Sequence, residues 1–175
     1  MAYGKIRQPM KSLELKWGLI VGGTYLIWLY VSYWLGMHTS GLAMMQIIGL
    51  ISLGITFLGF LLGLREVRFA TPEMTWTEGV KSGTIIAGIA ALFAILTQVG
   101  YFIFVHPEFP DLMTEEMRQY FAAQQLKEED LDAAIEAVKE TFSMKAYMVK
   151  AGAGMFIVGV IFSAIIMALP CRLAK

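Results

Sequence analysis

Two histidines and several methionines are the side chains in this sequence whose chemistry would suit a metal. His38 and His106 each follow an apolar stretch and are expected on the same side of a membrane. Imidazole and thioether ligands together suit Cu(I). Methionine is also a common filler of apolar cores, however, and no compact His or Cys spacing accompanies these residues. We therefore predict no metal site, and name His38 and His106 as the candidates for one. The methionines expected near them are Met37, Met44, Met45, Met113, Met117, Met144 and Met148.

Other features of the chain offer little for catalysis. No nucleophile elbow, P-loop, dinucleotide fingerprint, H-E-x-x-H or zinc spacing occurs in the sequence. We expect no ionisable residue inside the spans, which disfavours an ion-coupled pump, and we predict neither enzymatic activity nor a cofactor. The polar residues of the apolar stretches are expected to form hydrogen bonds between helices. They are Gln46, Ser52, Thr56, Thr84, Thr97, Gln98 and Ser163.

Long stretches without charge define the elements that carry these side chains. The chain is 57% hydrophobic and only 16% charged, which is far from ordinary globular usage. About 20 helical residues cross the roughly 30 Å apolar core of a bilayer. The predicted fold class is therefore all-α, an integral membrane four-helix bundle that forms one domain over residues 1–175. The predicted spans are about 17–35, 42–63, 82–105 and 151–169, with a break at the glycine-flanked residues 36–41.

Basic residues near the span ends predict the orientation of the chain. They precede span one and lie between spans two and three, whereas the loop between spans one and two has none. By the positive-inside rule, both termini and the middle loop are cytoplasmic. The first span should remain uncleaved, because its apolar stretch exceeds the roughly 15 residues of a signal peptide. Glu66 should pair with a neighbouring arginine or with the basic N-terminal segment. The topology residues are Lys16, Arg65, Arg68, Lys81 and Arg172.

The segment between spans three and four, residues 107–145, is the only part with soluble character, and it holds ten of the fourteen acidic residues. Apolar residues recur at helical spacing over 112–121 and 131–142, which predicts two short amphipathic helices that turn near residues 126–127. We expect an extracytoplasmic acidic helical hairpin. Charge runs usually form a solvated face, and the functional alternative is a docking surface for a basic partner. Its residues would be Glu115, Glu116, Glu128, Glu129 and Asp132.

Glycine pairs at G-x-x-x-G spacing predict close contacts between spans. This spacing lets helix backbones approach each other in membranes, although glycine is common in membrane helices in any case. The pairs are Gly18 and Gly22, Gly59 and Gly63, and Gly79 and Gly83.

Short matches indicate two related halves of the chain. Residues 16–23 and 81–88 share K-x-G-x-I-x-x-G, and residues 33–38 and 101–106 share Y-x-x-x-x-H. Each match is short enough to arise by chance. If the repeat is real, the bundle consists of two parallel span pairs related by an axis along the membrane normal.

The chain resembles a family of small four-span bacterial membrane proteins that is catalogued only as a domain of unknown function. The resemblance covers nearly the whole chain and rests on LKWGLI, LGLREVR and the acidic segment that begins HPEF. It implies a bacterial inner membrane and an uncleaved first span. It assigns no substrate and no catalytic residue.

These observations favour a function in binding over one in catalysis. The net charge is zero, so no global field argues for a nucleic-acid partner. We predict an accessory, scaffolding or assembly subunit of a membrane complex, in contact with the lipid bilayer and with other membrane proteins or itself. The alternative is a small passive channel or transporter built from two parallel span pairs. Its polar path would run through Gln46, Thr56, Thr97 and Gln98.

Overall fold

The computed structural model describes residues 10–124 and 128–169, without the side chains of residues 10, 11, 42 and 128–130. Six α-helices and no strand occur in these ranges. Two helices are short, α4 (Phe109–Ala123) and α5 (Glu128–Thr141). The other four are long and apolar enough to cross a membrane, which confirms the predicted all-α class with four possible spans. They are α1 (Met10–Trp34), α2 (Leu42–Ala70), α3 (Trp76–Gly100) and α6 (Met144–Ala168).

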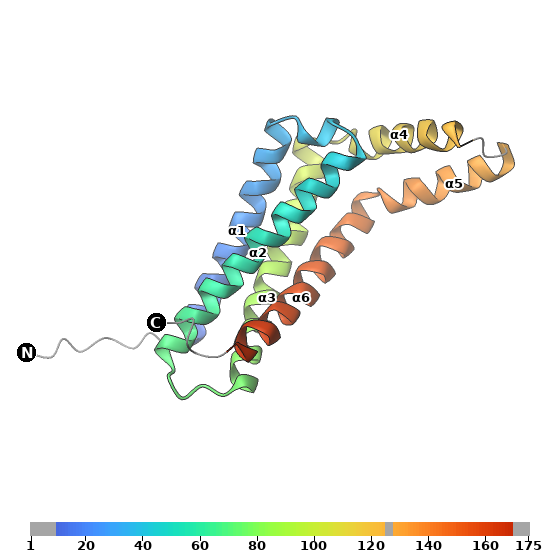
Figure 1. Ribbon diagram of the computed structural model, residues 1–175. Helices are drawn as coiled ribbons and strands as arrows, with labels where there is room; N and C mark the ends of the chain where they lie inside the picture. Colours follow the sequence, from blue (N-terminus) through green and yellow to red (C-terminus); the bar gives the residue numbers. More distant parts are fainter. Residues whose placement is uncertain (1–9, 125–127, 170–175) are drawn as a thin grey trace, which may run out of the picture.

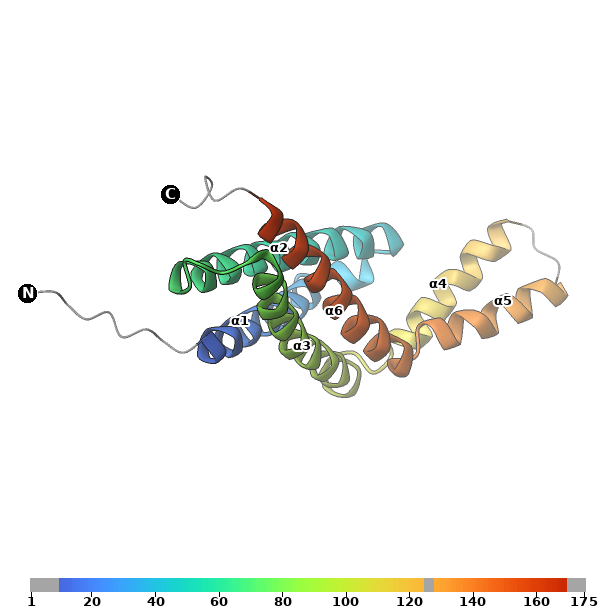
Figure 2. The same cartoon turned by 90° about the horizontal axis from the view of Figure 1, so that it is seen from below.

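The four long helices form a bundle around α3. Helix α3 packs against α6, α1 and α2, and α2 also packs against α1 and α6. Figure 1 shows that α1 begins and α6 ends at one end of the bundle, here called the basal end, where α2 is also followed by α3. At the opposite end, the arm end, α4 and α5 project to one side of the bundle (Figures 1 and 2). These two helices pack against each other and are called the arm.

Each long helix extends beyond its predicted span at one end, because the helix continues into the polar residues that flank the apolar stretch. At the start of α3, Thr75 Oγ accepts from the Glu78 backbone N–H at 3.3 Å, and the Glu78 carboxylate accepts from the Thr75 N–H at 2.8 Å. This reciprocal capping box lets α3 begin before the apolar residues do. At the start of α6, Ser143 Oγ accepts from the Ala146 N–H at 3.2 Å. Apolar composition therefore predicts the spans, and the caps set the helix ends.

Two irregular turns at the arm end position the histidines. Between α1 and α2, the 3₁₀ turn η1 (Met37–Thr39) is flanked by Gly36 and Gly41, whose positive φ angles of 72° and 86° favour glycine. Helix α3 continues into a π-helical turn, η2 (Tyr101–Val105). The His106 backbone N–H closes this turn by donating to the Tyr101 carbonyl at 2.8 Å. Such π turns are rare and are frequent at functional sites.

Glycines bring the long helices into close contact. All six predicted glycines face a neighbouring helix so closely that an added Cβ would overlap its atoms. An added Cβ at Gly88 of α3, by contrast, would meet no atom of another helix within 4 Å. The packed glycines are Gly18 and Gly22 of α1, which face α3, Gly59 and Gly63 of α2, which face α1, and Gly79 and Gly83 of α3, which face α6.

Candidate functional site at the base of the arm

The two Y-x-x-x-x-H segments meet at the arm end in one cluster. The ring of Tyr33 lies 6.0 Å from that of His38 and 5.4 Å from that of His106. The ring of Tyr101 lies 5.2 Å from His38 and 6.1 Å from His106. Each tyrosine therefore contacts the histidine of its own segment and the histidine of the other segment. Together with Ser32, these four residues are called the Tyr–His cluster.

A hydrogen-bonded chain holds His38 in its neutral form. The Ser32 hydroxyl donates to the Leu29 carbonyl at 2.8 Å, and its oxygen also lies 2.9 Å from His38 Nε2. Because the only hydroxyl proton of Ser32 is used, His38 Nε2–H is the donor in that second bond, and Nδ1 accepts from the Tyr101 hydroxyl. Ser32, His38 and Tyr101 are 0%, 3% and 2% exposed. Both ring nitrogens of His38 are thus engaged inside the protein.

Burial disfavours a charge on either histidine. It is the main reason why the pKa of His38 is lowered from 6.5 to about 4, and the nearby His106 adds to this effect. Burial also lowers the pKa of His106, against the opposing influence of the Glu108 carboxylate. Within the described structure, His106 Nε2 is buried without a hydrogen-bond partner. Both imidazoles are therefore neutral at pH 7.

The surroundings of the histidines are aromatic. Met113 is fully buried among Tyr101, Phe102 and Phe109, whereas Met144 is exposed. In residues 10–124 and 128–169, no three side chains of the His, Cys, Asp and Glu types come together as metal ligands would. A metal at His38 would have to displace Tyr101 or Ser32 from a ring nitrogen. The geometry is that of a hydrogen-bonded aromatic junction.

The Tyr–His cluster joins the bundle to the arm. Phe109, in the first turn of α4, is 1% exposed, and its ring lies 5.9 Å from Tyr101 and 5.7 Å from His106. The same ring lies 5.5 Å from Tyr147 of α6 and 6.3 Å from Phe142, next to the end of α5. Beyond this base, α4 and α5 bury apolar side chains mainly against each other. The direction of the arm is therefore set by packing around Phe109.

Glu14 is an ionisable residue that precedes the predicted span of residues 17–35 and yet is buried in the structure. It lies within the span-capable part of α1, Ser12–Trp34, and is only 3% exposed. The Ser82 hydroxyl of α3 donates to Glu14 Oε1 at 2.5 Å. Sequence analysis missed this pair because charges were assumed to lie outside the span. The available signal was spacing, since Glu14 stands one helical turn before Gly18, which also faces α3.

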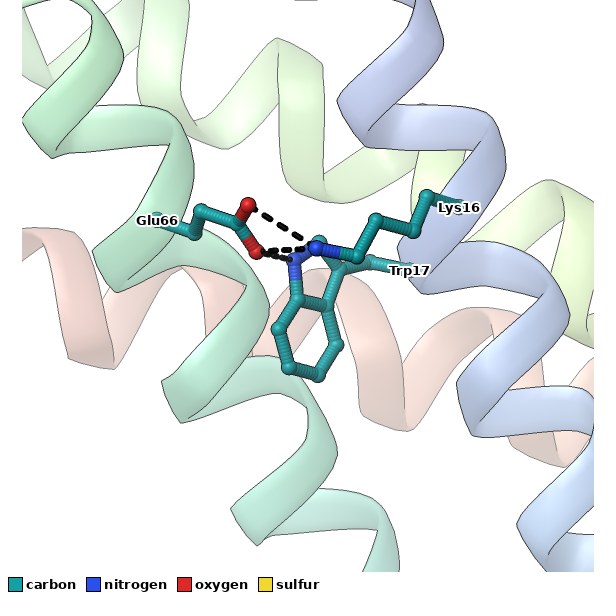
Figure 3. A network of polar contacts seen from close by, with 3 residues as sticks. All are labelled: Lys16, Trp17 and Glu66. Carbon is teal, nitrogen blue, oxygen red and sulfur yellow. Dashed lines mark hydrogen bonds and ion pairs between the residues drawn. The ribbon is translucent and has the colours of Figure 1, made fainter.

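Lys16, Trp17 and Glu66 form a polar network at the basal end, shown in Figure 3. Lys16 Nζ lies 2.9 and 2.8 Å from the two carboxylate oxygens of Glu66, and Trp17 Nε1 donates to Oε2 at 2.6 Å. Of the two partners expected for Glu66, the structure selects the N-terminal segment.

The other topology residues lie apart from this network. Arg65 is exposed and lies over the ring of Phe69 at 5.4 Å. Arg68 Nη1 donates to the Leu169 carbonyl at 3.5 Å, and Lys81 is exposed. Arg172 lies outside the described residues. Their role in topology stays a prediction from the positive-inside rule.

Glu66→Gln is expected to lower the free energy of unfolding by about 1 kcal/mol, because the Lys16–Glu66 pair is partly exposed but is reinforced by Trp17. The matched control is Glu73→Gln, an exposed carboxylate near the same end, which should change stability by less than about 0.5 kcal/mol. Unfolding titrations in mild detergent at low and high salt measure both. Equal effects of the two substitutions would refute a stabilising network.

Most polar residues of the apolar stretches form hydrogen bonds within their own helix. The hydroxyls of Ser52, Thr56, Thr84, Thr97 and Ser163 each donate to a carbonyl of their own helix, so the expectation of bonds between helices is wrong for them. Gln98 Nε2 of α3 does donate to the Tyr25 hydroxyl of α1 at 2.9 Å. Of the four residues named for a channel, Thr56, Thr97 and Gln98 are buried and Gln46 is exposed on α2.

The candidate partner surface lies along the arm. Glu115 and Asp132 are exposed and Glu116 is half-buried, whereas the side chains of Glu128 and Glu129 lie outside the description. Arg118 lies 3.9 Å from Glu115, so basic groups are interleaved with the acidic ones. The surface is acidic on balance. A shallow hollow in it is lined by Arg118, Asp132, Ile135, Glu136, Lys139 and Glu140.

The long apolar helices, the packed glycines and the projecting arm define a multi-pass membrane protein. The chain belongs to the family described as protein of unknown function (DUF4199), whose model matches residues 16–172. This match confirms the expected membership of a family without an assigned function. No curated protein and no solved structure matches the chain.

Proposed function

We propose that the protein is an accessory or assembly subunit of a complex in a bacterial inner membrane, and that its arm binds a basic segment of a partner protein. The arm is the observation that carries this proposal. It projects from the bundle in both views (Figures 1 and 2) and buries Met113, Ile135 and Val138. The outer surface of the arm is therefore free to bind another molecule, and such binding would give the projecting arm a function.

Charge at the two ends of the bundle supports an orientation with the arm outside the cell membrane. Lys16, Arg65, Arg68 and Lys81 are at or near the basal end, and most of the acidic residues are on or near the arm. The positive-inside rule assigns the basal end, with both termini, to the cytoplasm. An extracytoplasmic arm would meet the outer loops or domains of neighbouring membrane proteins.

The chemistry of the arm favours a partner that is basic and presents a short segment. The exposed carboxylates of Glu115, Asp132 and Glu136 lie on its surface, and complementary charge contributes most to specificity and association rate. A passive channel is the competing function, but Gln46 is exposed on α2, and the hydroxyls of Thr56 and Thr97 donate to carbonyls of their own helices. Protein binding is therefore the function that we favour.

Site-specific crosslinking in cells tests this function. A photoreactive residue at the exposed Ala133 of α5 should crosslink to one protein through a basic extracytoplasmic segment, whereas the same residue at the exposed Leu53 of α2 should not. The double charge reversal Asp132→Lys with Glu136→Lys should reduce the crosslink at least about tenfold, because like charges then face each other. Glu73→Lys, a reversal of an exposed carboxylate near the basal end, serves as the matched control and should leave the yield unchanged.

Two results would count against partner binding by the arm. One is the absence of any protein crosslink from Ala133 in cells that express the protein at its normal level. The other is a crosslinked neighbour whose yield is unaffected by the double reversal. Labelling of Ala133→Cys by a membrane-impermeant maleimide in spheroplasts, with Cys171 replaced, tests the orientation separately.

A further inference from the structure

We propose that the Tyr–His cluster is an acid-sensitive latch, which fixes the direction of the arm relative to the bundle while His38 and His106 are neutral and frees the arm to move when they are protonated. This inference concerns the movement of the arm and goes beyond partner binding. Its test uses the isolated protein, so it can succeed or fail independently of any partner.

The latch lies on the connection between the arm and the bundle. Only residues 106–108 link η2 to α4, and only residues 142–143 link α5 to α6. Phe109 fills the space beside both links, where its ring contacts Tyr101, His106 and Tyr147. A change in the cluster therefore acts directly on the packing that sets the direction of the arm.

Protonation forces the cluster to rearrange its hydrogen bonds at His38 and, in the described part of the chain, leaves a buried donor without an acceptor at His106. His38 Nε2–H already donates to Ser32, and Nδ1 already accepts from the Tyr101 hydroxyl. A proton on Nδ1 would turn that nitrogen into a donor, so the Tyr101 hydroxyl would have to accept from it and turn its own proton elsewhere. A proton on the buried His106 Nε2 would find no acceptor among the described atoms. The two charges would also repel each other.

Tyrosine side chains surround the two histidines. Helix α1 contributes Tyr30 and Tyr33, η2 contributes Tyr101, and α6 contributes Tyr147, and none of these side chains is a carboxylate. The junction before α4 contributes Glu108, an exposed carboxylate that favours the charged form of His106. The helix α2 side adds the apolar Met45. When both histidines are protonated, two positive charges lie near a single carboxylate of the described residues, that of Glu108, which is exposed to solvent. The charge that is not offset favours release of the arm.

Distance measurements between spin labels test the latch in the full chain in lipid nanodiscs, with Cys171 replaced. The labels are placed at exposed positions, Ala133→Cys on α5 and Leu53→Cys on α2. We expect a narrow distance distribution at pH 8 that shifts and broadens below about pH 5. The double substitution His38→Gln with His106→Gln retains side chains that can donate and accept but cannot titrate. It should keep the distribution of pH 8 throughout.

Two further variants make the experiment decisive. Glu108→Gln removes the nearest carboxylate and should leave the transition in place, with a midpoint at lower pH. His106→Gln disturbs no hydrogen bond of Nε2 and removes one of the two titrating groups, so the transition should depend less steeply on pH. A distribution that is identical at pH 8 and pH 4.5 would overturn the latch. So would a transition that persists unchanged without either histidine, because the carboxylates of the arm would then be its cause.

Discussion

Replacement of Gly83 by alanine is expected to lower the free energy of unfolding by about 1–3 kcal/mol, although it adds a single methyl group. The new Cβ would overlap the side chain of Ser163 on α6, and Leu64 Cδ2 lies 3.5 Å away on another side. Ser163 is fully buried and its hydroxyl donates to the Gly159 carbonyl at 2.6 Å. A serine Cβ cannot move without its backbone, so α3 and α6 must separate locally.

Gly88→Ala is the matched control for this prediction. Gly88 lies on the same helix, and an added Cβ there would meet no atom of another helix within 4 Å. Alanine is a better helix former than glycine, so Gly88→Ala should be neutral or stabilise the protein by up to about 1 kcal/mol. Unfolding titrations in bilayer-like micelles compare the two variants directly. Equal stabilities would mean that Gly83 is not needed for the contact between α3 and α6.

Gly79→Ala should have a smaller effect than Gly83→Ala, despite its position on the same face of α3. The atoms that a Cβ on Gly79 would overlap belong to the end of the Met167 side chain. Methionine has three side-chain torsions and can move aside at low cost. The two substitutions thus differ because the Met167 side chain can move aside and the Ser163 Cβ cannot. The G-x-x-x-G spacing of the sequence does not reveal this difference.

The spans could be predicted from the sequence because the bilayer imposes a local rule. Each span needs about 20 apolar residues in a row, and this pattern can be read without any knowledge of contacts. The same rule accounts for the missed Glu14. The rule predicts that a charge near the end of an apolar stretch faces water. Glu14 is instead buried where α1 packs against α3, and it accepts a hydrogen bond from Ser82 of α3. Burial by another helix is not a local property.

Glycine spacing indicated the packing faces but not the helices that fill them. Gly18 and Gly83 hold matching positions in the two K-x-G-x-I-x-x-G segments, yet Gly18 faces Ile89 of α3 and Gly83 faces Ser163 of α6. Equivalent positions of a symmetrical pair of hairpins would face equivalent partners. The sequence similarity of the halves is thus not matched by equivalent packing at this position.

The candidate site was only half accessible to sequence analysis. Topology predicted that His38 and His106 lie on the same side of the membrane, and the shared Y-x-x-x-x-H spacing linked each to a tyrosine. Their convergence depends on the turn η1 and on the π-helical turn η2, which determine where each ring points. Ser32 had no recognisable signal, because a single serine in an apolar span is most often bonded within its own helix.

Acidification from pH 7 to pH 4.5 is expected to lower the free energy of unfolding by about 2 kcal/mol through His38 alone. In the unfolded chain this imidazole takes up its proton near pH 6.5, whereas burial lowers its pKa to about 4 in the native state. Between these values the unfolded state binds more protons, so stability falls as the pH falls and the loss levels off below about pH 4.

His38→Gln isolates this contribution from that of the carboxylates. Glutamine can still donate to Ser32 and accept from Tyr101, but it takes up no proton, so the variant should have a shallower dependence of stability on pH between 6.5 and 4. Unfolding titrations at several pH values in this window, on both proteins, give the two slopes. Because the carboxylates are the same in both, the difference between the slopes belongs to His38. Parallel curves would show that the His38 imidazole is not held neutral by the fold.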